Sequence, residues 1–405
     1  MVNALGIALI WLAAAPPAGK IGFQRLGEVK VEISGTYHHW LDRQRYVMLD
    51  VQYAQTRAGR IANLGIADVL EQKFFQVPFG QDELKKAHPG LSTHFPYPIS
   101  FFKSDRALLR FDWERDRQSG APERLPAYCF LTPRVQSTCD PTEIGNVDPI
   151  PPWGYFKELG PDPTEKYLYG AILVYDGDIL KKGKLLSLRL FRFPLSDETL
   201  TSDWEMEFAI PKREKPLSLQ SSVFFSADGR MLAFVEYHDL TDAERSTPVP
   251  PPQVYVIDTK TKQVSTFPIP VTAYGVSFSR DGKYLAVGSL ETGELLRINL
   301  AAGRIDRRVK AGTSVDKLLT TARGDTFLVF SGRSRKPKPI QVRRWSDLKV
   351  VQTIPIRSLF PERDSMDSSY VWMSADGRHL VTTNTGENGF AVKEEGLVVF
   401  RLEGK

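Results

Sequence analysis

One short pattern, repeated three times, constrains the fold of this chain more than any other feature. VSFSRDGKYLAVGS at 276–289 holds an apolar run, an Asp-Gly pair and a second apolar run, and SVFFSADGRMLAFVEY at 222–237 and VWMSADGRHLVTTNT at 371–385 repeat this arrangement. An Asp-Gly pair between two β-rich runs is a strong hairpin signal, because Gly adopts positive φ without steric penalty and Asp bonds to the local backbone. Each copy therefore predicts two antiparallel strands joined by a tight turn. The expected turn formers are Asp228, Asp281 and Asp376.

Two weaker copies extend the series. LLTTARGDTFLVFSG at 318–332 carries Gly324 and Asp325 in reversed order, and ISFFKSDRALLRFDW at 99–113 keeps the Ser-Asp pair without the Gly. The sequence therefore predicts five hairpins, and we interpret the Asp residues that recur in them as turn formers and not as catalytic groups.

Further β-rich runs follow each hairpin. After the second-strand run come VYVIDT (254–259) and VSTFPI (264–269) in one repeat, and LLRINL (295–300) and IDRRVKA (305–311) in the next. The turns are spaced by 53 residues (228 to 281), 44 residues (281 to 325) and 51 residues (325 to 376). Four antiparallel strands at a period of about 40–50 residues make one blade of a β-propeller.

The first half of the chain is more degenerate but follows the same plan. The stretch 37–52 resembles a first hairpin, and 167–211 supplies three strands of a third blade. The last repeat stops after its third strand, 397–405, and would expose an unpaired edge unless the strand-like segment 21–34 fills it. We therefore predict an all-β fold: one domain, 20–405, forming a seven-bladed β-propeller of four-stranded antiparallel blades, with the ring closed by an N-terminal strand.

Residues 1–19 contain no Lys, Arg, Asp or Glu and have the length of a secretory leader. The apolar part, Leu5 to Ala15, is too short to span a bilayer comfortably. We interpret it as a signal peptide, and a short hydrophobic anchor or an N-terminal strand are the alternatives. The protein is then expected to be exported to the periplasm or the cell exterior, with no transmembrane span beyond the leader.

Composition and cysteine content exclude several classes. With 42% hydrophobic and 25% charged residues the chain can bury a large core. Its net charge of +5 is far smaller than the clustered positive charge of a dedicated nucleic-acid-binding protein. The two cysteines, Cys129 and Cys139, cannot form a four-cysteine zinc site. In an exported chain they could form a disulfide contributing roughly 2–3 kcal/mol, and two free thiols are the alternative.

The repeats resemble those of a known group of repeat proteins. VSFSRDGKYLAVGS followed by ELLRINLAAGRI, together with VYVIDTKTKQV, is similar to the YVTN and WD40-like β-propeller repeats of bacterial proteins, and RRWSDLKVV at 343–351 is similar to the Trp-Asp strand of WD40 blades. The resemblance covers 220–405 well and 36–210 faintly. It implies a fold and no single activity, because this group includes binding scaffolds, lactonase-type hydrolases and quinoprotein dehydrogenase subunits.

Long connections are expected on one face of such a propeller. The loops between the second and third strands and the joins between blades leave from the same face, which we call the long-loop face. Loops of this length are usually kept for a function, although neutral decoration of a tolerant scaffold is the alternative. The segments expected there are 78–98, 115–124, 132–154, 176–184, 238–253, 331–339 and 386–396.

The candidate binding residues lie in these segments. Their basic side chains could attract an acidic ligand, and the aromatic ones could stack on a sugar or peptide, with an ordinary solvated surface as the alternative. The candidates are Arg115, Arg117, Trp153, Tyr155, Lys181, Lys182, His238, Arg333, Arg335 and Lys336. We predict a monomeric binding or interaction module that contacts a protein or an anionic small molecule or polymer through the long-loop face.

Signatures of catalysis are scarce. The chain has no Gly-x-Ser-x-Gly, no phosphate-binding glycine loop and no His-Glu-x-x-His, which argues against an enzyme. Asp176 and Asp178 have the spacing of calcium ligands without the longer pattern of a dedicated site, so we expect a polar turn and no cofactor. The alternative function is a lactonase-type hydrolase or a quinoprotein-dehydrogenase-type subunit with its site at the central channel.

Overall fold

The computed structural model describes the second half of the chain almost continuously and the first half in shorter segments. The described residues are 20–31, 40–41, 46–56, 59–68, 70–79, 97–102, 106–115, 123–131, 142–143, 154–175, 185–195, 201–210, 218–219, 223–237, 251–331, 338–361, 371–374, 376–383 and 395–404.

These residues form seven antiparallel sheets, which we number in chain order. The first sheet consists of β2 (Trp40–Leu41), β3 (Tyr46–Thr56), β4 (Gly59–Asp68) and β5 (Lys73–Phe79). The second sheet consists of β6 (Tyr97–Phe102), β7 (Arg106–Arg115), β8 (Glu123–Leu131) and β9 (Thr142–Glu143). The third sheet consists of β10 (Gly154–Pro161), β11 (Tyr167–Tyr175), β12 (Leu185–Pro194) and β13 (Trp204–Ala209). The fourth sheet is β14 (Ser218–Leu219), β15 (Phe224–Phe225), β16 (Met231–Tyr237), β17 (Gln253–Asp258) and β18 (Val264–Pro268).

The last three sheets follow the same plan. The fifth sheet consists of β19 (Ala273–Phe278), β20 (Tyr284–Ser289), β21 (Glu294–Asn299) and β22 (Arg304–Lys310). The sixth consists of β23 (Lys317–Thr320), β24 (Thr326–Phe330), β25 (Ile340–Arg344) and β26 (Val350–Ile354). The seventh consists of β27 (Val371–Met373), β28 (His379–Thr383) and β29 (Glu395–Gly404), with β1 (Ile21–Val31) as its fourth strand. A single short helix, α2 (Ile356–Leu359), is present among the described residues.

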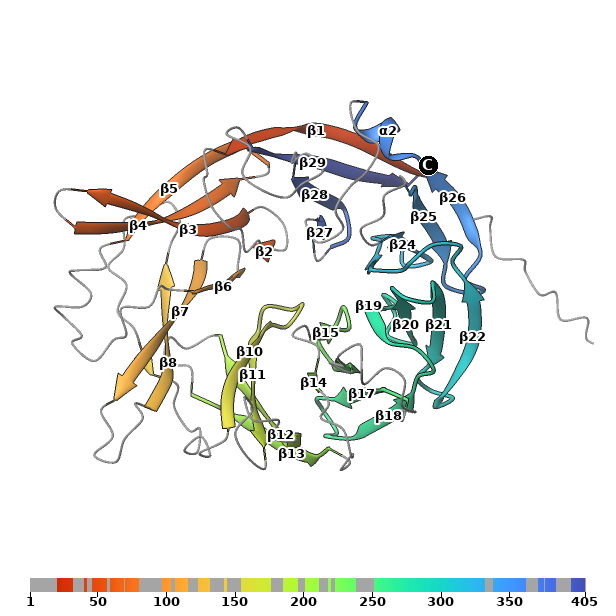
Figure 1. Ribbon diagram of the computed structural model, residues 1–405, viewed down its shortest axis with the longest axis horizontal. Coiled ribbons are helices and arrows are strands. Elements are labelled where there is room, and N and C mark those ends of the chain that lie inside the picture. The colour runs from red at the N-terminus through yellow and green to blue at the C-terminus, as the bar shows by residue number, and fades with distance from the viewer. Residues whose placement is uncertain are drawn as a thin grey trace, which may run out of the picture.

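Consecutive strands are neighbours in every sheet, except where β1 joins the seventh and where β14 pairs with β16 in the fourth. Figure 1 shows the sheets side by side around a common centre, with the first strand of each sheet innermost and the last outermost. In the fourth sheet the innermost position is shared by β14 and β15, which both pair with β16. This all-β arrangement of four-stranded antiparallel sheets is a propeller-like fold.

The N-terminal strand occupies the outer position of the seventh sheet. β1 pairs antiparallel with β29, from Ile21 opposite Gly404 to Val31 opposite Glu395, which is the position predicted for segment 21–34. β1 also contacts β5 of the first sheet, so one strand touches the first and the last sheets of the series.

The join between the second and third sheets differs from the prediction. The Pro-rich segment 132–154 was expected to be one connection, but β9 pairs with β8 within it and β10 begins at Gly154. The third sheet thereby gains an innermost strand that the sequence analysis did not identify. The weak β-pattern of GYFKELGP, with two glycines and a proline, explains why this strand was not recognised.

Apolar side chains fill the spaces between neighbouring sheets. Tyr169 of the third sheet and Phe234 of the fourth belong to one buried cluster, and Phe327 of the sixth sheet packs against Trp345 with ring centroids 4.5 Å apart. Burial of such side chains stabilises a fold by roughly 1.5–3 kcal/mol each. Ile21 of β1 is buried in the cluster between the sixth and seventh sheets, so the N-terminal strand is part of the core.

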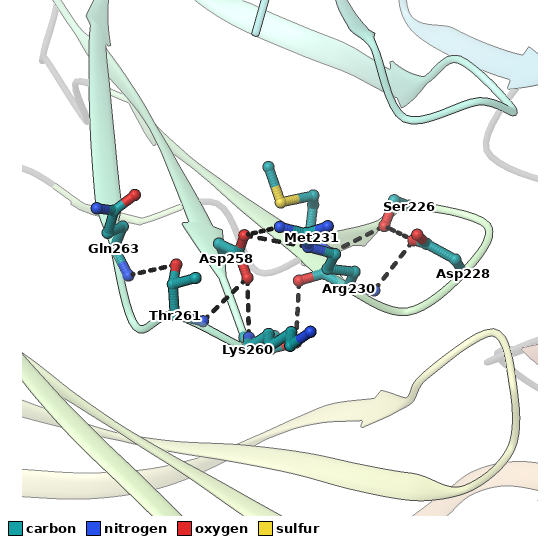
Figure 2. Close-up of polar contacts among 9 residues, drawn as sticks. Ser226, Asp228, Arg230, Met231, Asp258, Lys260, Thr261 and Gln263 are labelled. Carbon is teal, nitrogen blue, oxygen red and sulfur yellow. Dashed lines mark hydrogen bonds and ion pairs between the residues drawn. The ribbon is translucent and has the colours of Figure 1, made fainter. Parts of the chain in front are cut away.

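The Asp-Gly turns have the geometry that the sequence predicts. In the fourth sheet Ser226 Oγ donates to Asp228 Oδ1 (2.5 Å) and accepts from the amide of Met231 (2.8 Å), while Arg230 N–H donates to Asp228 Oδ1 (3.1 Å) (Figure 2). Gly229 has φ +70°, which only glycine adopts without strain.

The same contacts recur in the fifth and seventh sheets. Asp281 Oδ1 accepts from Ser279 Oγ (2.8 Å), and Asp376 Oδ1 accepts from Ser374 Oγ (2.5 Å). The expectation that these Asp residues form turns is therefore confirmed. In the sixth sheet Thr321 replaces the Ser, and its hydroxyl donates to the carbonyl of Thr326 (3.0 Å).

Candidate functional site

The two ends of the sheets differ in their connections. At one end lie the short turns that join the first strand to the second, such as 279–283 and 321–325, and we call this end the turn face. At the other end lie the connections from the second strand to the third, which reach from 238 to 252 in the fourth sheet. This is the long-loop face. The connections after β7, β11, β16, β24 and β28 lie at or close to the predicted segments, whereas the predicted join 132–154 contains β9 and ends where β10 begins.

Most of the predicted binding residues lie outside the described residues. Their side chains therefore carry no structural statement, and the long-loop site stays a prediction. This group comprises Arg117, Cys139, Trp153, Asp176, Asp178, Lys181, Lys182, His238, Arg333, Arg335 and Lys336.

Three candidates are placed by their backbone. Arg115 is the last residue of β7, directly before a connection of the long-loop face, and Cys129 lies in β8. Tyr155 lies in β10, the innermost strand of the third sheet, and so belongs to a strand instead of a loop.

The innermost strands bring three further side chains to the long-loop face. Tyr274, Lys317 and Trp372 stand at the starts of β19, β23 and β27, and Lys317 pairs with Phe330, after which the connection 331–339 leaves β24. Tyr274 is 41% exposed, and Lys317 Nζ lies 6.0 Å from the ring centroid of Trp372. Lys317 Nζ also donates to the carbonyl of Val371 (2.8 Å), which holds the ammonium between the sixth and seventh sheets.

Hydroxyl groups follow further along the same strands. Ser277 of β19 and Thr320 of β23 share a hydrogen bond of 2.8 Å between their hydroxyl oxygens, and Thr320 also donates to the carbonyl of Phe278 (2.6 Å). Within the described part of the chain, these inner strands present aromatic, cationic and hydroxyl groups, which can stack on and hydrogen-bond a ligand.

A pocket of about 420 Å³ lies on the turn face, between the sixth and seventh sheets. We call it the terminal pocket, because Ile21 of β1 and the end of β29 form part of its wall. Its lining residues come from the turns of both sheets and from the two chain ends: Ile21, Thr321, Ala322, Arg323, Asp376, Gly377, Arg378, His379, Arg401, Leu402 and Glu403.

Three arginines and two carboxylates line the terminal pocket. Arg323 pairs with Asp325 of its own turn at 3.3 Å, and Arg378 Nε lies 4.0 Å from Asp376 Oδ2. Arg401 takes part in none of the ion pairs among the described residues. The pocket therefore has a surplus of positive charge that its own carboxylates do not offset.

His379 is part of the same wall. Both ring nitrogens are buried and have no hydrogen-bond partner among the described residues. Burial lowers the pKa of His379, and the nearby charges of Arg401 and Arg378 lower it further against the opposing effect of Asp376. The imidazole is therefore neutral at pH 7, with one donor and one acceptor unused.

Sequence reasoning missed the terminal pocket. Arg323, Arg378 and Arg401 lie in turns or at a strand end, where charged residues are common, and the fold alone brings them together. A signal exists in the aligned repeats, because the fourth sheet has an arginine and an aspartate, Arg230 and Asp258, where the seventh has two arginines.

No group of three or more His, Cys, Asp or Glu side chains with metal-binding geometry occurs among the residues that the structure describes. Within those ranges no helix is both long and apolar enough to cross a membrane.

Comparison with known proteins gives a distant likeness of fold. No family model and no curated protein matches the chain. Among solved structures, the chain is similar to one in a crystal structure of the mitotic checkpoint complex, with 12% identity over 99% of this chain and 98% of that chain and a TM-score of 0.49. It is also similar to apo AztD from Citrobacter koseri (11% identity, 78% and 72% coverage, TM-score 0.40) and to Kuenenia stuttgartiensis hydrazine synthase (11% identity, 81% and 100% coverage, TM-score 0.44).

These likenesses are too distant to assign a function. The propeller-like fold rests on the sheet topology of the chain itself.

Proposed function

We propose that this protein is an exported, closed seven-bladed β-propeller that acts as a binding module. Its contact surface is the long-loop face, and its ligand is a protein or an anionic small molecule or polymer. The seven sheets and the position of β1 beside both β29 and β5 support a closed ring of seven blades. The leader-like composition of residues 1–19 supports export.

The observation that carries this proposal is the group formed by Tyr274, Lys317 and Trp372. These residues lie on three neighbouring innermost strands, at the end from which the long connections leave. The exposed ring of Tyr274 can stack on a ligand, and the ammonium of Lys317 beside the partly buried Trp372 can attract its negative charge. The connections 176–184 and 331–339, which follow β11 and β24 on the same face, carry further cationic residues in the sequence.

The connection 290–293 in the fifth sheet strengthens this interpretation. It is short, and Tyr274 on β19 of the same sheet is 41% exposed. An exposed aromatic ring on an innermost strand is accessible to a ligand that approaches this face.

Binding of a defined polyanion tests the proposal. Poly-L-glutamate is titrated into the full chain and into two variants: one carries Arg333→Gln, Arg335→Gln and Lys336→Gln, the other Tyr274→Ala. A matched control removes three cations from the turn face by Lys260→Gln, Arg304→Gln and Lys349→Gln. We expect several-fold weaker binding for the loop variant, an effect that fades at high salt, and near wild-type binding for the control.

Metal analysis of the same protein completes the test. Stoichiometric calcium or zinc would contradict a binding module without cofactor and would favour the enzyme alternative. Equal weakening by the loop variant and the turn-face control would contradict the long-loop face as the contact surface.

A further inference from the structure

The seventh sheet departs from its neighbours at one pair of equivalent positions. In the fourth sheet Arg230, directly after the turn, makes two hydrogen bonds to Asp258 at the end of the third strand, at 3.1 and 2.7 Å (Figure 2). The strand register places Arg378 and Arg401 at the same two positions in the seventh sheet. Two guanidinium groups therefore stand where the fourth sheet has an ion pair.

The fifth and sixth sheets do not have two arginines at these equivalent positions. The equivalent pair is Lys283 with Asn299 in the fifth sheet and Asp325 with Arg344 in the sixth. Among these four sheets, only the seventh places two cations at the paired positions, and both arginines line the terminal pocket. Two cations that line one pocket favour an anionic ligand.

The surrounding groups reinforce the positive charge. Arg323 of the sixth sheet adds a third guanidinium to the lining, and Asp376 Oδ1 is already occupied by the hydroxyl of Ser374 (2.5 Å) and the amide of Arg378 (2.9 Å). At the rim, Arg280 of the fifth sheet donates to the carbonyl of Asp376 at 3.1 Å. The carboxylate of Asp376 is thus partly engaged by hydrogen bonds within its own turn.

His379 is unusual for its position. The residues at the equivalent place in the fourth, fifth and sixth sheets are Met231, Tyr284 and Thr326. A buried polar atom without a partner costs about 1–3 kcal/mol, so a ring with both nitrogens unpaired is unfavourable for folding alone. A ligand with hydrogen-bonding oxygens could satisfy this side chain.

We infer that the terminal pocket is a binding site for a small ligand that carries a phosphate or diphosphate group, held by Arg378 and Arg401 of the seventh sheet with Arg323 of the sixth. This site is separate from the long-loop face and goes beyond the proposed function. Arg is the side chain best suited to phosphate, because its planar fork donates two parallel hydrogen bonds to two oxygens of one anion.

The geometry favours phosphate over carboxylate. The guanidinium groups come from two different sheets, and a tetrahedral phosphate offers three outer oxygens in different directions with about two negative charges. A single carboxylate has two oxygens in one plane and one charge. The volume of about 420 Å³ lies within the range of small-molecule pockets and exceeds what an inorganic phosphate needs.

Calorimetric titration of the full chain with inorganic phosphate, pyrophosphate and citrate tests this inference, at constant ionic strength. We expect one saturable site for pyrophosphate, with weaker binding of phosphate and citrate. Arg378→Gln and Arg401→Gln should each weaken pyrophosphate binding by about tenfold or more, since each removes charge-assisted hydrogen bonds. Arg304→Gln, which removes an exposed arginine outside the pocket, serves as the matched control and should change the affinity less than about twofold.

The unliganded variants give a second readout that keeps the inference falsifiable. Because Arg378 has only a 4.0 Å contact with Asp376 and Arg401 takes part in no ion pair among the described residues, removing either should leave the melting temperature about equal without ligand and abolish the rise produced by pyrophosphate. Absence of saturable phosphate and pyrophosphate binding, or equal effects of all three variants, would overturn the site. Tighter binding of citrate than of pyrophosphate, with the same dependence on both arginines, would overturn the phosphate class.

Discussion

Ile21 and Gln352 bond to each other twice. The amide of Ile21 donates to Gln352 Oε1 at 2.7 Å, and Gln352 Nε2 donates to the carbonyl of Ile21 at 3.0 Å. The two residues are 331 positions apart, in β1 and in β26 of the sixth sheet. The start of the N-terminal strand is thus bonded to the neighbouring sheet as well as to β29.

Gln352→Ala should destabilise the fold by about 1–3 kcal/mol, because it removes both bonds and leaves the amide of the buried Ile21 unpaired. Urea unfolding of the variant and the wild type measures this difference. Val350→Ala, on the same strand with a side chain that is 42% exposed, is the control and should cost about 0.5 kcal/mol or less. Equal stability of the two variants would contradict a stabilising role for this pair.

The turn glycines provide a matched comparison. Gly282 and Gly377 have φ of +68° and +70°, but a Cβ at Gly282 meets no atom within 4 Å, whereas one at Gly377 would lie 2.5 Å from the amide nitrogen of Ala322. Gly282→Ala should therefore cost about 1–2 kcal/mol for backbone strain alone. Gly377→Ala should cost clearly more, because the sixth-sheet turn must move. Thermal melts of both variants check the order, and a larger loss for Gly282→Ala would contradict it.

The hairpins of the second half were predictable because their signal is local. Ser226, Asp228 and Gly229 lie within four residues and specify the turn by contacts among themselves. In the third sheet the turn between the first two strands has different contacts, and its sequence contains no Asp-Gly pair. Asp162 accepts from the amides of Lys166 and Tyr167 at 3.0 Å, and Glu165 takes the left-handed position with φ 58°.

The terminal pocket could not be predicted in the same way. Arg323 and Arg401 are brought together by the packing of the sixth and seventh sheets and by the position of β1, which are properties of the whole fold. The long-loop candidates were predicted from length and charge, and they stay predictions because their side chains lie outside the described residues.

Protonation of His379 should make the protein less stable in acid. Burial lowers the pKa of the folded-state imidazole below its usual value of 6.5. Below about pH 6.5 the unfolded chain therefore binds a proton at His379 that the folded chain does not, so stability falls as the pH drops from there toward the folded-state pKa.

The variant His379→Gln isolates this contribution. Between pH 7 and pH 5 it should lose less stability than the wild type, as measured by urea unfolding at each pH. Parallel pH profiles of the two proteins would contradict the lowered pKa.

Arg297 joins the fifth sheet to the sixth. Its Nε and Nη2 donate to Asp306 at 2.8 Å, its Nη1 donates to the carbonyl of Ser346 at 2.6 Å, and the residue is 5% exposed. Arg297→Met should cost about 3 kcal/mol, because it leaves Asp306 without its partner. Adding Asp306→Ala to this variant should recover part of the loss in the same unfolding assay. A double variant no more stable than the single one would contradict the pairing.

β1 completes the seventh sheet by pairing with β29, and we propose that it thereby closes a ring of seven blades. Deletion of residues 20–34 tests it most directly, by urea unfolding of chain 35–405 beside chain 20–405. We predict one cooperative transition for the longer chain and its loss in the shorter one, because the outer edge of β29 and the core contacts of Ile21 disappear together. An unchanged cooperative transition in chain 35–405 would contradict the claim.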